Sequence, residues 1–216
     1  LSRLEGYFAF VSPLEVAYTD RTEVAYAQVV TGGLFETLGR AAALGRTFSD
    51  RRTTPEVVLS DAYWRRRFAA QPSIIGRSIR IGSQPATIVG VMPRDVVFPY
   101  PGMLGPSGFT RVTGVDLWTS MEFTGPMAAE QRTLGSNGAP MRGARFLGAI
   151  GRLRPGTSID QARDDLASIA RDLAREYPGT NEGWTTSVTS ALDQTVGHVR
   201  PALLMLIVGV ALVLLM

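Results

Sequence analysis

Residues 57–68 read Val-Val-Leu-Ser-Asp-Ala-Tyr-Trp-Arg-Arg-Arg-Phe and contain the sharpest change of pattern in the chain. The three apolar residues at its start predict a short buried strand. Ser60 or Asp61 can cap the helix that follows, in which Trp64 and Phe68 lie four residues apart on one face. This stretch therefore predicts a strand at 57–59 that is followed directly by a helix.

The same helix carries three consecutive arginines, Arg65, Arg66 and Arg67. Such a run suggests a site for phosphate or another acidic ligand. However, neighbouring side chains on a helix point about 100° apart, so the three side chains do not converge on one anion. We therefore interpret the run as a solvent-exposed helix face.

Upstream of this stretch the sequence predicts two strands and a short helix. Alternating apolar residues at 4–16 and 24–30 are typical of half-buried strands. Thr31-Gly32-Gly33 interrupts that pattern. The spacing of Leu34, Phe35 and Leu38 then predicts a short helix that Gly39 closes.

Downstream the sequence predicts a β-hairpin. Residues 78–81 and 86–92 form its strands, and Gly82-Ser83 is a two-residue connection of the kind that supplies positive φ. Pro93 ends the second strand because proline lacks the N–H that a strand ladder needs. Glycine and proline then recur from 99 to 143, a long irregular stretch to which the sequence assigns no function. Within it, Asp116-Leu117-Trp118 predicts an ordered island with Trp118 packed inward.

A further strand is expected at 145–153, followed by a turn at Arg154-Pro155-Gly156-Thr157. Ser158 and Gln161 match a capping box at the start of a helix whose apolar residues recur every three or four positions. Pro178-Gly179 ends that helix.

The charged face of the same helix carries local ion pairs in the prediction. Asp160 precedes Arg163 by three residues, and Asp172 precedes Arg175 by the same spacing. After the helix, a polar stretch is expected to contain one more strand around 185–189.

Residues 202–216 carry no charged side chain. A helix that packs one face on a core keeps a polar stripe, and a bilayer core takes roughly 20 apolar residues as a helix. We therefore expect the start of a transmembrane helix at 201–216, in a chain that is part of a longer protein. A short core helix is the alternative. His198, Arg200 and Pro201 precede the apolar run and form a candidate membrane-coupling segment.

Composition excludes several functions. The net charge is only +3 and basic and acidic residues interleave, which argues against a nucleic-acid partner. Without cysteine there is no disulfide, thiolate or sulfur-ligated metal, and a single histidine cannot form a histidine metal cluster. Asp164 and Asp165 are adjacent on a helix and diverge, so they do not share a proton. We expect no catalytic residue, no metal and no cofactor, and hence no enzyme.

The order of these motifs resembles the MacB-like periplasmic core domain of ABC-transporter permeases of the FtsX/MacB type, and is most similar to the large-loop permeases common in acidobacteria. The matching segments are 29–39, 43–48, 57–68, 75–81, 88–93, 116–118 and 151–156. The positions that the resemblance implies as structural motif residues are Phe35, Leu38, Gly39, Gly45, Arg46, Ser60, Trp64, Phe68, Gly76, Gly90, Pro93, Trp118, Pro155 and Gly156. The sequence departs from the family pattern at Thr31-Gly32-Gly33 and at Thr119-Ser120.

The resemblance implies an α+β fold. A porter-like α/β lobe would comprise 1–46 and 143–197, a β-rich lobe would be inserted at 47–142, and the start of a transmembrane helix would follow at 201–216. The domain would lie on the periplasmic side of the inner (cytoplasmic) membrane. The implied partners are a cytoplasmic ABC ATPase on a separate subunit or domain, membrane lipid, a second permease copy and a periplasmic adaptor.

The function expected from this resemblance is mechanical coupling. Movement of the membrane helices, driven by ATP hydrolysis, would pass through the short connection at 196–201 to the extracytoplasmic lobes, because a short tether transmits displacement better than a flexible linker. Two alternatives remain open: a ligand-sensing extracytoplasmic module of a membrane receptor, and a membrane-tethered hydrolase.

Overall fold

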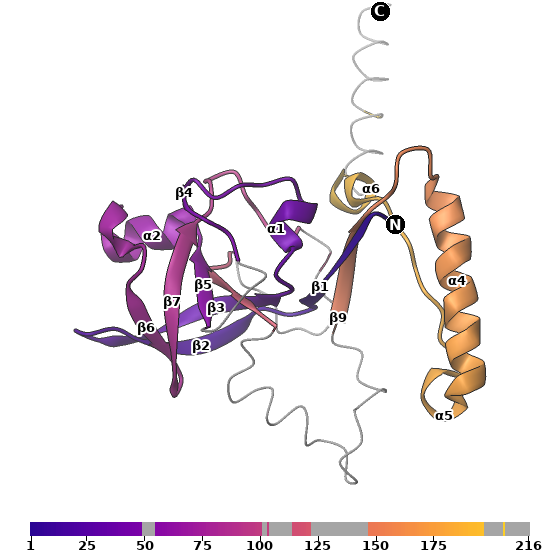
Figure 1. The fold of residues 1–216 in the computed structure, drawn as a ribbon, viewed down its shortest axis with the longest axis horizontal. Coiled ribbons are helices and arrows are strands. Elements are labelled where there is room, and N and C mark those ends of the chain that lie inside the picture. Colours follow the sequence, from indigo (N-terminus) through magenta and orange to yellow (C-terminus); the bar gives the residue numbers. More distant parts are fainter. Residues whose placement is uncertain (49–54, 101–102, 104–113, 122–146, 197–204, 206–216) are drawn as a thin grey trace, which may run out of the picture. The chain divides into compact units, whose positions relative to one another are not determined.

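The computed structural model describes residues 1–48, 55–100, 103, 114–121, 147–196 and 205 (Figure 1). The chain divides into two compact units. The first comprises 1–98 with 105–154, and the second comprises 99–104 with 155–216. Each unit is described separately below.

The first unit is built mainly of strands. They are β1 (Arg3–Phe8), β2 (Ser12–Ala17), β3 (Thr22–Val30), β4 (Leu44–Gly45), β5 (Glu56–Leu59), β6 (Ser78–Ile81), β7 (Gln84–Val91), β8 (Leu117–Ser120) and β9 (Leu147–Arg152). Between them lie α1 (Leu34–Thr37), α2 (Asp61–Phe68) and the 3₁₀ helix η1 (Pro72–Ile74). These bounds confirm the predicted strands at 24–30 and 145–153, the short helix after Gly33 and the strand-to-helix switch at Ser60. The stretch at 4–16, predicted as one strand, instead forms two, β1 and β2.

The strands join into one sheet in which six of them close a ring. Pairing runs in the order β2-β6-β7-β5-β8-β3-β1-β9, and β2 also pairs with β3. The ring therefore contains β2, β6, β7, β5, β8 and β3, while β1 and β9 extend the sheet beyond it and β4 pairs with β7 (Figure 1). Closing the ring gives each of these six strands a partner on both sides.

Alternating side chains of the ring strands fill its core. In β6, for example, Ile79 and Ile81 are buried while Ser78 and Arg80 are exposed. The main apolar cluster comprises Val16, Ala25, Ala27, Val57, Leu59, Tyr63, Ile74, Ile79, Ile81, Ala86, Ile88, Val91 and Leu117. It thus includes Tyr63 from α2 and Ile74 from η1, which attaches both helices to the sheet.

Strands β5 and β8 are buried on both faces. Leu117 belongs to the main cluster, whereas Trp118, which points to the other face, packs edge-on against Phe35 of α1 at 5.4 Å between ring centroids. Phe35 in turn stacks on Phe48 at 5.9 Å. This double burial explains why residues 57–59 of β5 form a continuous apolar run rather than an alternating one. It also confirms that Trp118 packs inward.

The β6–β7 hairpin has the predicted form. Gly82 adopts φ +58° in its two-residue connection, and β7 ends at Val91, before Pro93. In the same unit, Gly39 follows α1 with φ +71°, as expected for the residue that closes a helix.

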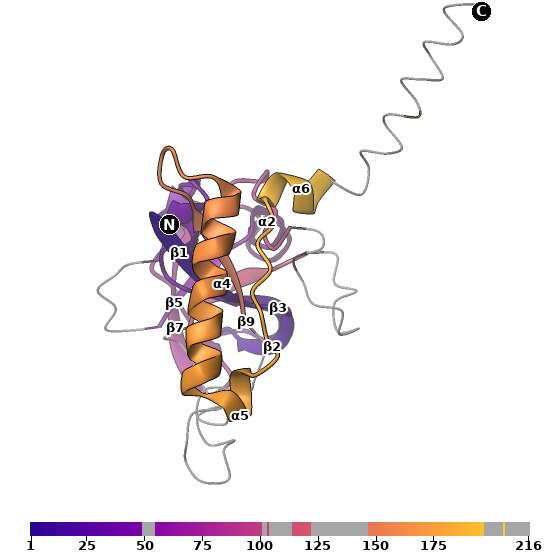
Figure 2. The same cartoon turned by 90° about the vertical axis from the view of Figure 1, so that its right-hand side faces the viewer.

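The second unit consists of helices in its described part: α4 (Ile159–Glu176), α5 (Pro178–Asn181) and α6 (Ala191–Val196) (Figure 2). Ser158 and Gln161 form the predicted capping box. The ion pairs of Arg163 with Asp160 and of Arg175 with Asp172 are also present. The long helix ends at Glu176, and Pro178-Gly179 starts the single turn of α5.

The prediction of a strand around 185–189 is wrong. These residues carry no regular secondary structure, and four of the five are exposed. Threonine and valine favour strands only where a neighbouring strand and a buried face are available.

Other predictions fall on residues outside the described part. Most of 99–143 lies there, as does the expected membrane span at 201–216 apart from Met205. Among the described residues, no helix has the length and apolar character needed to cross a membrane. The lobe division at Arg46 and Arg142 stays a prediction, and such a boundary would have to pass through the sheet, because β2 and β3 pair with strands beyond Arg46.

Candidate functional site

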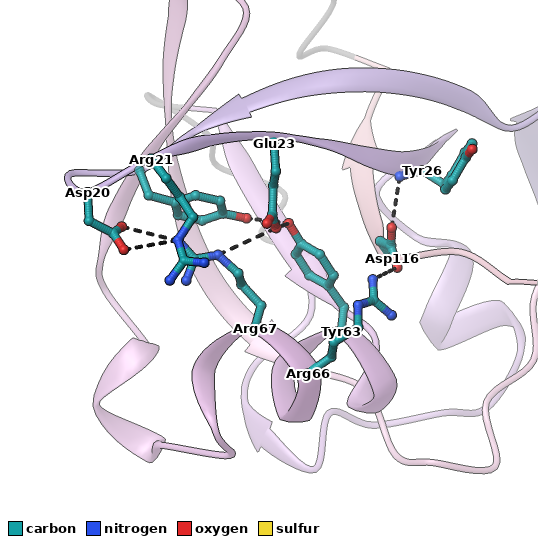
Figure 3. Close-up of polar contacts among 9 residues, drawn as sticks. Asp20, Arg21, Glu23, Tyr26, Tyr63, Arg66, Arg67 and Asp116 are labelled. Carbon is teal, nitrogen blue, oxygen red and sulfur yellow. Dashed lines mark hydrogen bonds and ion pairs between the residues drawn. The ribbon is translucent and has the colours of Figure 1, made fainter.

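The most concentrated group of interacting polar side chains in the described structure lies between α2 and the β2–β3 turn (Figure 3). Ser60 positions α2 by accepting a hydrogen bond from the backbone N–H of Tyr63 at 3.2 Å. The β2–β3 turn and β3 contribute the opposing groups. We call the following set the α2 cluster: Tyr18, Asp20, Arg21, Glu23, Tyr63, Arg66, Arg67 and Asp116.

Two tyrosines and a carboxylate form a chain of hydrogen bonds in this cluster. The Tyr63 hydroxyl donates to Glu23 Oε1 at 2.6 Å (Figure 3). The hydroxyls of Tyr18 and Tyr63 are also hydrogen-bonded. Burial raises the pKa of Tyr18 to about 12, and burial together with the bond to Glu23 raises the pKa of Tyr63 still further. Both phenols therefore stay protonated at neutral pH and serve as hydrogen-bonding links.

Arg67 occupies the centre of the cluster, with only 10% of its side chain exposed. Its Nη2 lies 3.2 Å from Asp20 Oδ1, and its Nε lies 3.4 Å from Glu23 Oε1. The guanidinium also lies over the rings of Tyr18 and Phe68, at 4.2 and 5.3 Å from their centroids. The interpretation of the three arginines as a solvent-exposed face is therefore wrong for Arg67.

The other two arginines bind separate carboxylates. Arg65, whose side chain is 60% exposed, pairs with Asp61 one turn earlier at 2.8 Å. Arg66, 61% exposed, pairs with Asp116 at 2.7 Å. Asp116 also accepts a hydrogen bond from the backbone N–H of Tyr26 at 3.0 Å. The prediction that the arginines do not converge on one anion is thus confirmed.

In chemical terms the α2 cluster connects three segments. Arg67 joins α2 to the β2–β3 turn, and Arg66 joins α2 to the residue before β8. Its acidic and basic groups largely neutralise one another. Across the described residues, no three or more histidine, cysteine or acidic side chains are placed to hold a metal ion.

The glycines of the family motif have steric roles. Gly45 of β4 and Gly90 of β7 are direct partners in the sheet. A Cβ on Gly90 would lie 2.0 Å from the carbonyl oxygen of Arg46, and one on Gly45 would lie 2.3 Å from that of Val89. Gly45 also adopts positive φ, at +71°, as do Gly76 and Gly156, at +84° and +81°.

The remaining motif residues hold the elements together. Arg46 Nη2 pairs with Glu56 Oε1 at 2.6 Å, and Trp64 Nε1 donates to the carbonyl of Gln71 at 3.0 Å. Phe68 packs edge-on against Tyr18 at 5.5 Å. Leu38 follows α1 as its C-terminal cap, Pro93 follows β7, and Pro155 begins the turn before α4.

The candidate membrane-coupling segment is not among these residues. His198, Arg200 and Pro201 lie outside the described part of the chain, so their role stays a prediction. The last described helix before them, α6, ends at Val196.

Sequence reasoning missed the acidic side of the α2 cluster. Asp20, Glu23 and Asp116 lie 47, 44 and 50 residues from their arginine partners. One signal was present: Asp20-Arg21-Thr22-Glu23 places two acidic residues next to the turn between two predicted strands, a position from which they can reach a neighbouring helix.

The sequence and the fold are similar to those of known proteins. A family model described as the MacB-like periplasmic core domain matches residues 2–169. The extracellular domain of the noncanonic ABC-type transporter YknZ from Gram-positive bacteria is similar, with a TM-score of 0.51 and 15% identity over 88% of this chain and 82% of that one. The periplasmic region of MacB from Actinobacillus actinomycetemcomitans gives a TM-score of 0.51 and 13% identity over 85% and 77%. Among curated proteins, none matches the sequence.

Proposed function

Because this chain belongs to the family of the MacB-like periplasmic core domain, we propose that it is the moving extracytoplasmic part of an ABC-transporter permease, which couples cytoplasmic ATP hydrolysis to export or mechanical work outside the membrane. The family match over residues 2–169 is the observation that carries the proposal. The ATP would be hydrolysed by an ATPase on a separate subunit or domain.

The construction of the first unit supports a mechanical role. A part that transmits displacement has to deform less than the connection that drives it. The closed ring of six strands gives each of them two hydrogen-bonded neighbours, and Arg66 and Arg67 connect α2 to β8 and to the β2–β3 turn. The paired strands and their close packing resist local deformation, and the partly exposed ion pairs add little to this.

The proposed route of force runs through 196–201. In this proposal the membrane helix begins at Pro201, where the missing N–H of proline costs nothing in the first turn. His198 and Arg200 would lie at the membrane surface. The connection between Val196 and Pro201 is too short to absorb much displacement, whereas a longer glycine-rich linker would behave as a coil.

The proposal also includes the arrangement of the whole assembly. The porter-like lobe would comprise 1–46 and 143–197, with 47–142 as the inserted lobe, on the periplasmic side of the inner membrane. Two permease copies would face each other, with lipid around the membrane helices and a periplasmic adaptor as a further partner. None of these roles requires the domain itself to carry a catalytic residue.

The test lengthens the tether in the full-length permease with its ATPase, reconstituted in nanodiscs. Several Gly-Ser residues are inserted after Val196, and a spin label is attached to a cysteine introduced at Ser83, which lies on the exposed β6–β7 turn. The chain has no cysteine of its own to interfere. Distances between the labels of the two copies are measured by pulsed electron paramagnetic resonance with and without ATP.

We expect ATP to shift the label distances in the unmodified protein and the tether insertion to abolish that shift while ATP hydrolysis continues. The matched control is the same insertion between Gly135 and Ser136, which should leave the shift intact. If the shift survives a lengthened tether, rigid coupling is wrong. If ATP produces no shift even without the insertion, the domain is not a moving part.

A further inference from the structure

A pocket of about 410 Å³ lies beside the α2 cluster in the first unit. This volume is within the range of sites that hold small molecules. The residues that line it come from the β2–β3 turn, the C-terminal half of α2 and the segment leading into β6: Tyr18, Thr19, Asp20, Arg66, Arg67, Phe68, Ala69, Gln71, Ile74, Arg77, Ser78 and Ile79. Neither the family match nor the proposed coupling assigns it a role.

The lining carries more basic than acidic side chains. Arg66, Arg67 and Arg77 contribute three positive charges, against the single negative charge of Asp20. Arg66 and Arg67 already have acidic partners. Arg77 differs from them, because its side chain makes no hydrogen bond or ion pair with any residue that the structure describes. The pocket therefore presents a guanidinium whose charge is not compensated.

Other residues of the lining are aromatic or aliphatic. Tyr18 and Phe68 contact each other edge-on, with 5.5 Å between their ring centroids. Ile74 and Ile79 are buried at 1% and 3% exposure and form part of the main core. A ligand that matches this lining has an anionic group for the arginines and an apolar body for the aromatic and aliphatic side chains.

Arg67 is preorganised to bind an anion. Stacking over Tyr18 fixes its guanidinium, and the side chain is nine-tenths buried. Its Nε faces Glu23 at 3.4 Å but makes no hydrogen bond, so its donors are incompletely satisfied. A guanidinium held by its surroundings loses less conformational entropy when it binds a carboxylate.

Asp20 occupies the place where an incoming anion would bind. Its side chain is 60% exposed and lies 3.2 Å from Nη2 of Arg67. A second bond, from Arg21 Nε at 3.1 Å, keeps the pKa of Asp20 below its usual range, so the carboxylate is charged at neutral pH. Because the Asp20 carboxylate is itself mostly exposed, it regains contact with water when it leaves Arg67, so another carboxylate can take its place at small cost.

We propose that this pocket binds a small organic carboxylate with an apolar body. The carboxylate binds Arg77 and replaces Asp20 at Arg67, and the apolar body packs against Tyr18 and Phe68. The same chemistry is offered by a free organic acid and by the C-terminal carboxylate of a peptide that ends in an apolar residue. The proposal does not depend on the mechanical function.

The test is isothermal titration calorimetry on the full-length protein in nanodiscs. The probes are 3-phenylpropionate and its uncharged amide, and acetyl-Gly-Phe with a free or an amidated C-terminus. The first pair represents a free acid and the second a peptide terminus. We expect each carboxylate probe to bind at least about tenfold more tightly than its amide, because charge-assisted hydrogen bonds are lost in the amide. The tighter of the two carboxylates identifies the source.

Three variants locate the binding. Arg77→Gln should weaken binding about tenfold, and Asp20→Asn should strengthen it severalfold by removing the competing carboxylate. Arg65→Gln is the matched control, because Arg65 is an exposed arginine of α2 that does not line the pocket. It should leave binding unchanged. All three positions are exposed, so the melting temperatures should stay close to that of the unmodified protein.

Binding of the amides as tightly as the acids overturns the proposal, as does the absence of binding by both carboxylates. If Arg65→Gln and Arg77→Gln weaken the binding of the acids equally, the acids respond only to the overall charge of the protein. This result overturns the proposal too. If Asp20→Asn fails to strengthen binding, the replacement of Asp20 is wrong.

Discussion

Replacing Gly90 by alanine should weaken the contact between β4 and β7. The added Cβ would lie 2.0 Å from the carbonyl oxygen of Arg46 and 2.9 Å from its carbonyl carbon. Real Cβ atoms do not approach other atoms closer than 3.0 Å, and the obstacle here is backbone, which cannot rotate away as a side chain does. To raise this distance from 2.0 Å to at least 3.0 Å, strand β4 has to move by about 1 Å, because a densely packed protein leaves no empty space for the added Cβ.

The size of the effect follows from the bonds that this shift breaks. Ala43 N–H donates to Val91 O at 2.8 Å, and Arg46 N–H donates to Val89 O at 2.9 Å. Each backbone bond contributes about 1 kcal/mol, so losing both lowers the free energy of unfolding by about 2 kcal/mol. Residual strain brings the expected loss to about 2–4 kcal/mol.

Urea unfolding measures this loss, and hydrogen exchange locates it. In Gly90→Ala, the amides of Ala43 and Arg46 should exchange faster, while those of the β6–β7 hairpin keep most of their protection. The control is Gly114→Ala, since a Cβ on Gly114 would meet nothing within 4 Å. A free energy of unfolding within about 0.5 kcal/mol of the unmodified protein, with unchanged exchange at Ala43 and Arg46, would refute the reasoning.

Three further predictions concern other parts of the fold. Ala69 and Ala70 follow α2 with φ of +48° and +59°, so replacing either by glycine should raise the free energy of unfolding by about 0.5–1 kcal/mol in urea titrations, and a decrease would contradict this. Ser158→Ala removes the cap of α4 and should cost about 1 kcal/mol, seen as faster amide exchange in the first turn of that helix; unchanged exchange would count against it. Because the folded state raises the pKa of Tyr18 from 10.0 to about 12, it holds the phenolic proton more tightly than the unfolded chain. Stability should therefore fall as the pH rises from about 10 towards about 12, less steeply in Tyr18→Phe, and equal slopes in the two proteins would argue against this source.

Elements set by neighbouring residues could be predicted from the sequence. Gly82 allows the tight turn between β6 and β7 because it adopts positive φ without steric cost. The capping box of Ser158 and Gln161 needs only residues three apart. The burial of Trp118 was expected from the ordered island that Asp116-Leu117-Trp118 predicts within the glycine- and proline-rich stretch. In each case the information that fixes the structure lies within a few residues.

The burial of Arg67 could not be predicted in this way. Helical spacing shows only that adjacent arginines diverge, and it does not show what each one meets. Arg67 is buried because the β2–β3 turn, far away in sequence, brings Asp20, Glu23 and Tyr18 to that face of α2. The same holds for Gly90. This position has no room for a Cβ because β4, which is distant in sequence, lies directly against it. At 185–189 the composition is typical of a strand, but these residues pair with no other strand. The prediction failed there because a favourable local composition is not sufficient for a strand.

The α2 cluster connects the stiffness of the first unit to the proposed pocket. Arg67 holds the β2–β3 turn through Asp20, yet Glu23 and the ring of Tyr18 hold the same guanidinium from the side of the core. A carboxylate that replaces Asp20 would therefore release the turn while leaving Arg67 fixed, since Glu23 and the ring of Tyr18 hold the guanidinium without Asp20. The effect of an occupied pocket should thus be confined to the turn around Asp20 and Arg21. In hydrogen exchange with 3-phenylpropionate, that turn should lose protection, whereas the ladder between β6 and β7 should keep it. If the amides of this ladder lost protection as well, the ion pair of Asp20 would be shown to support the closed ring of strands itself.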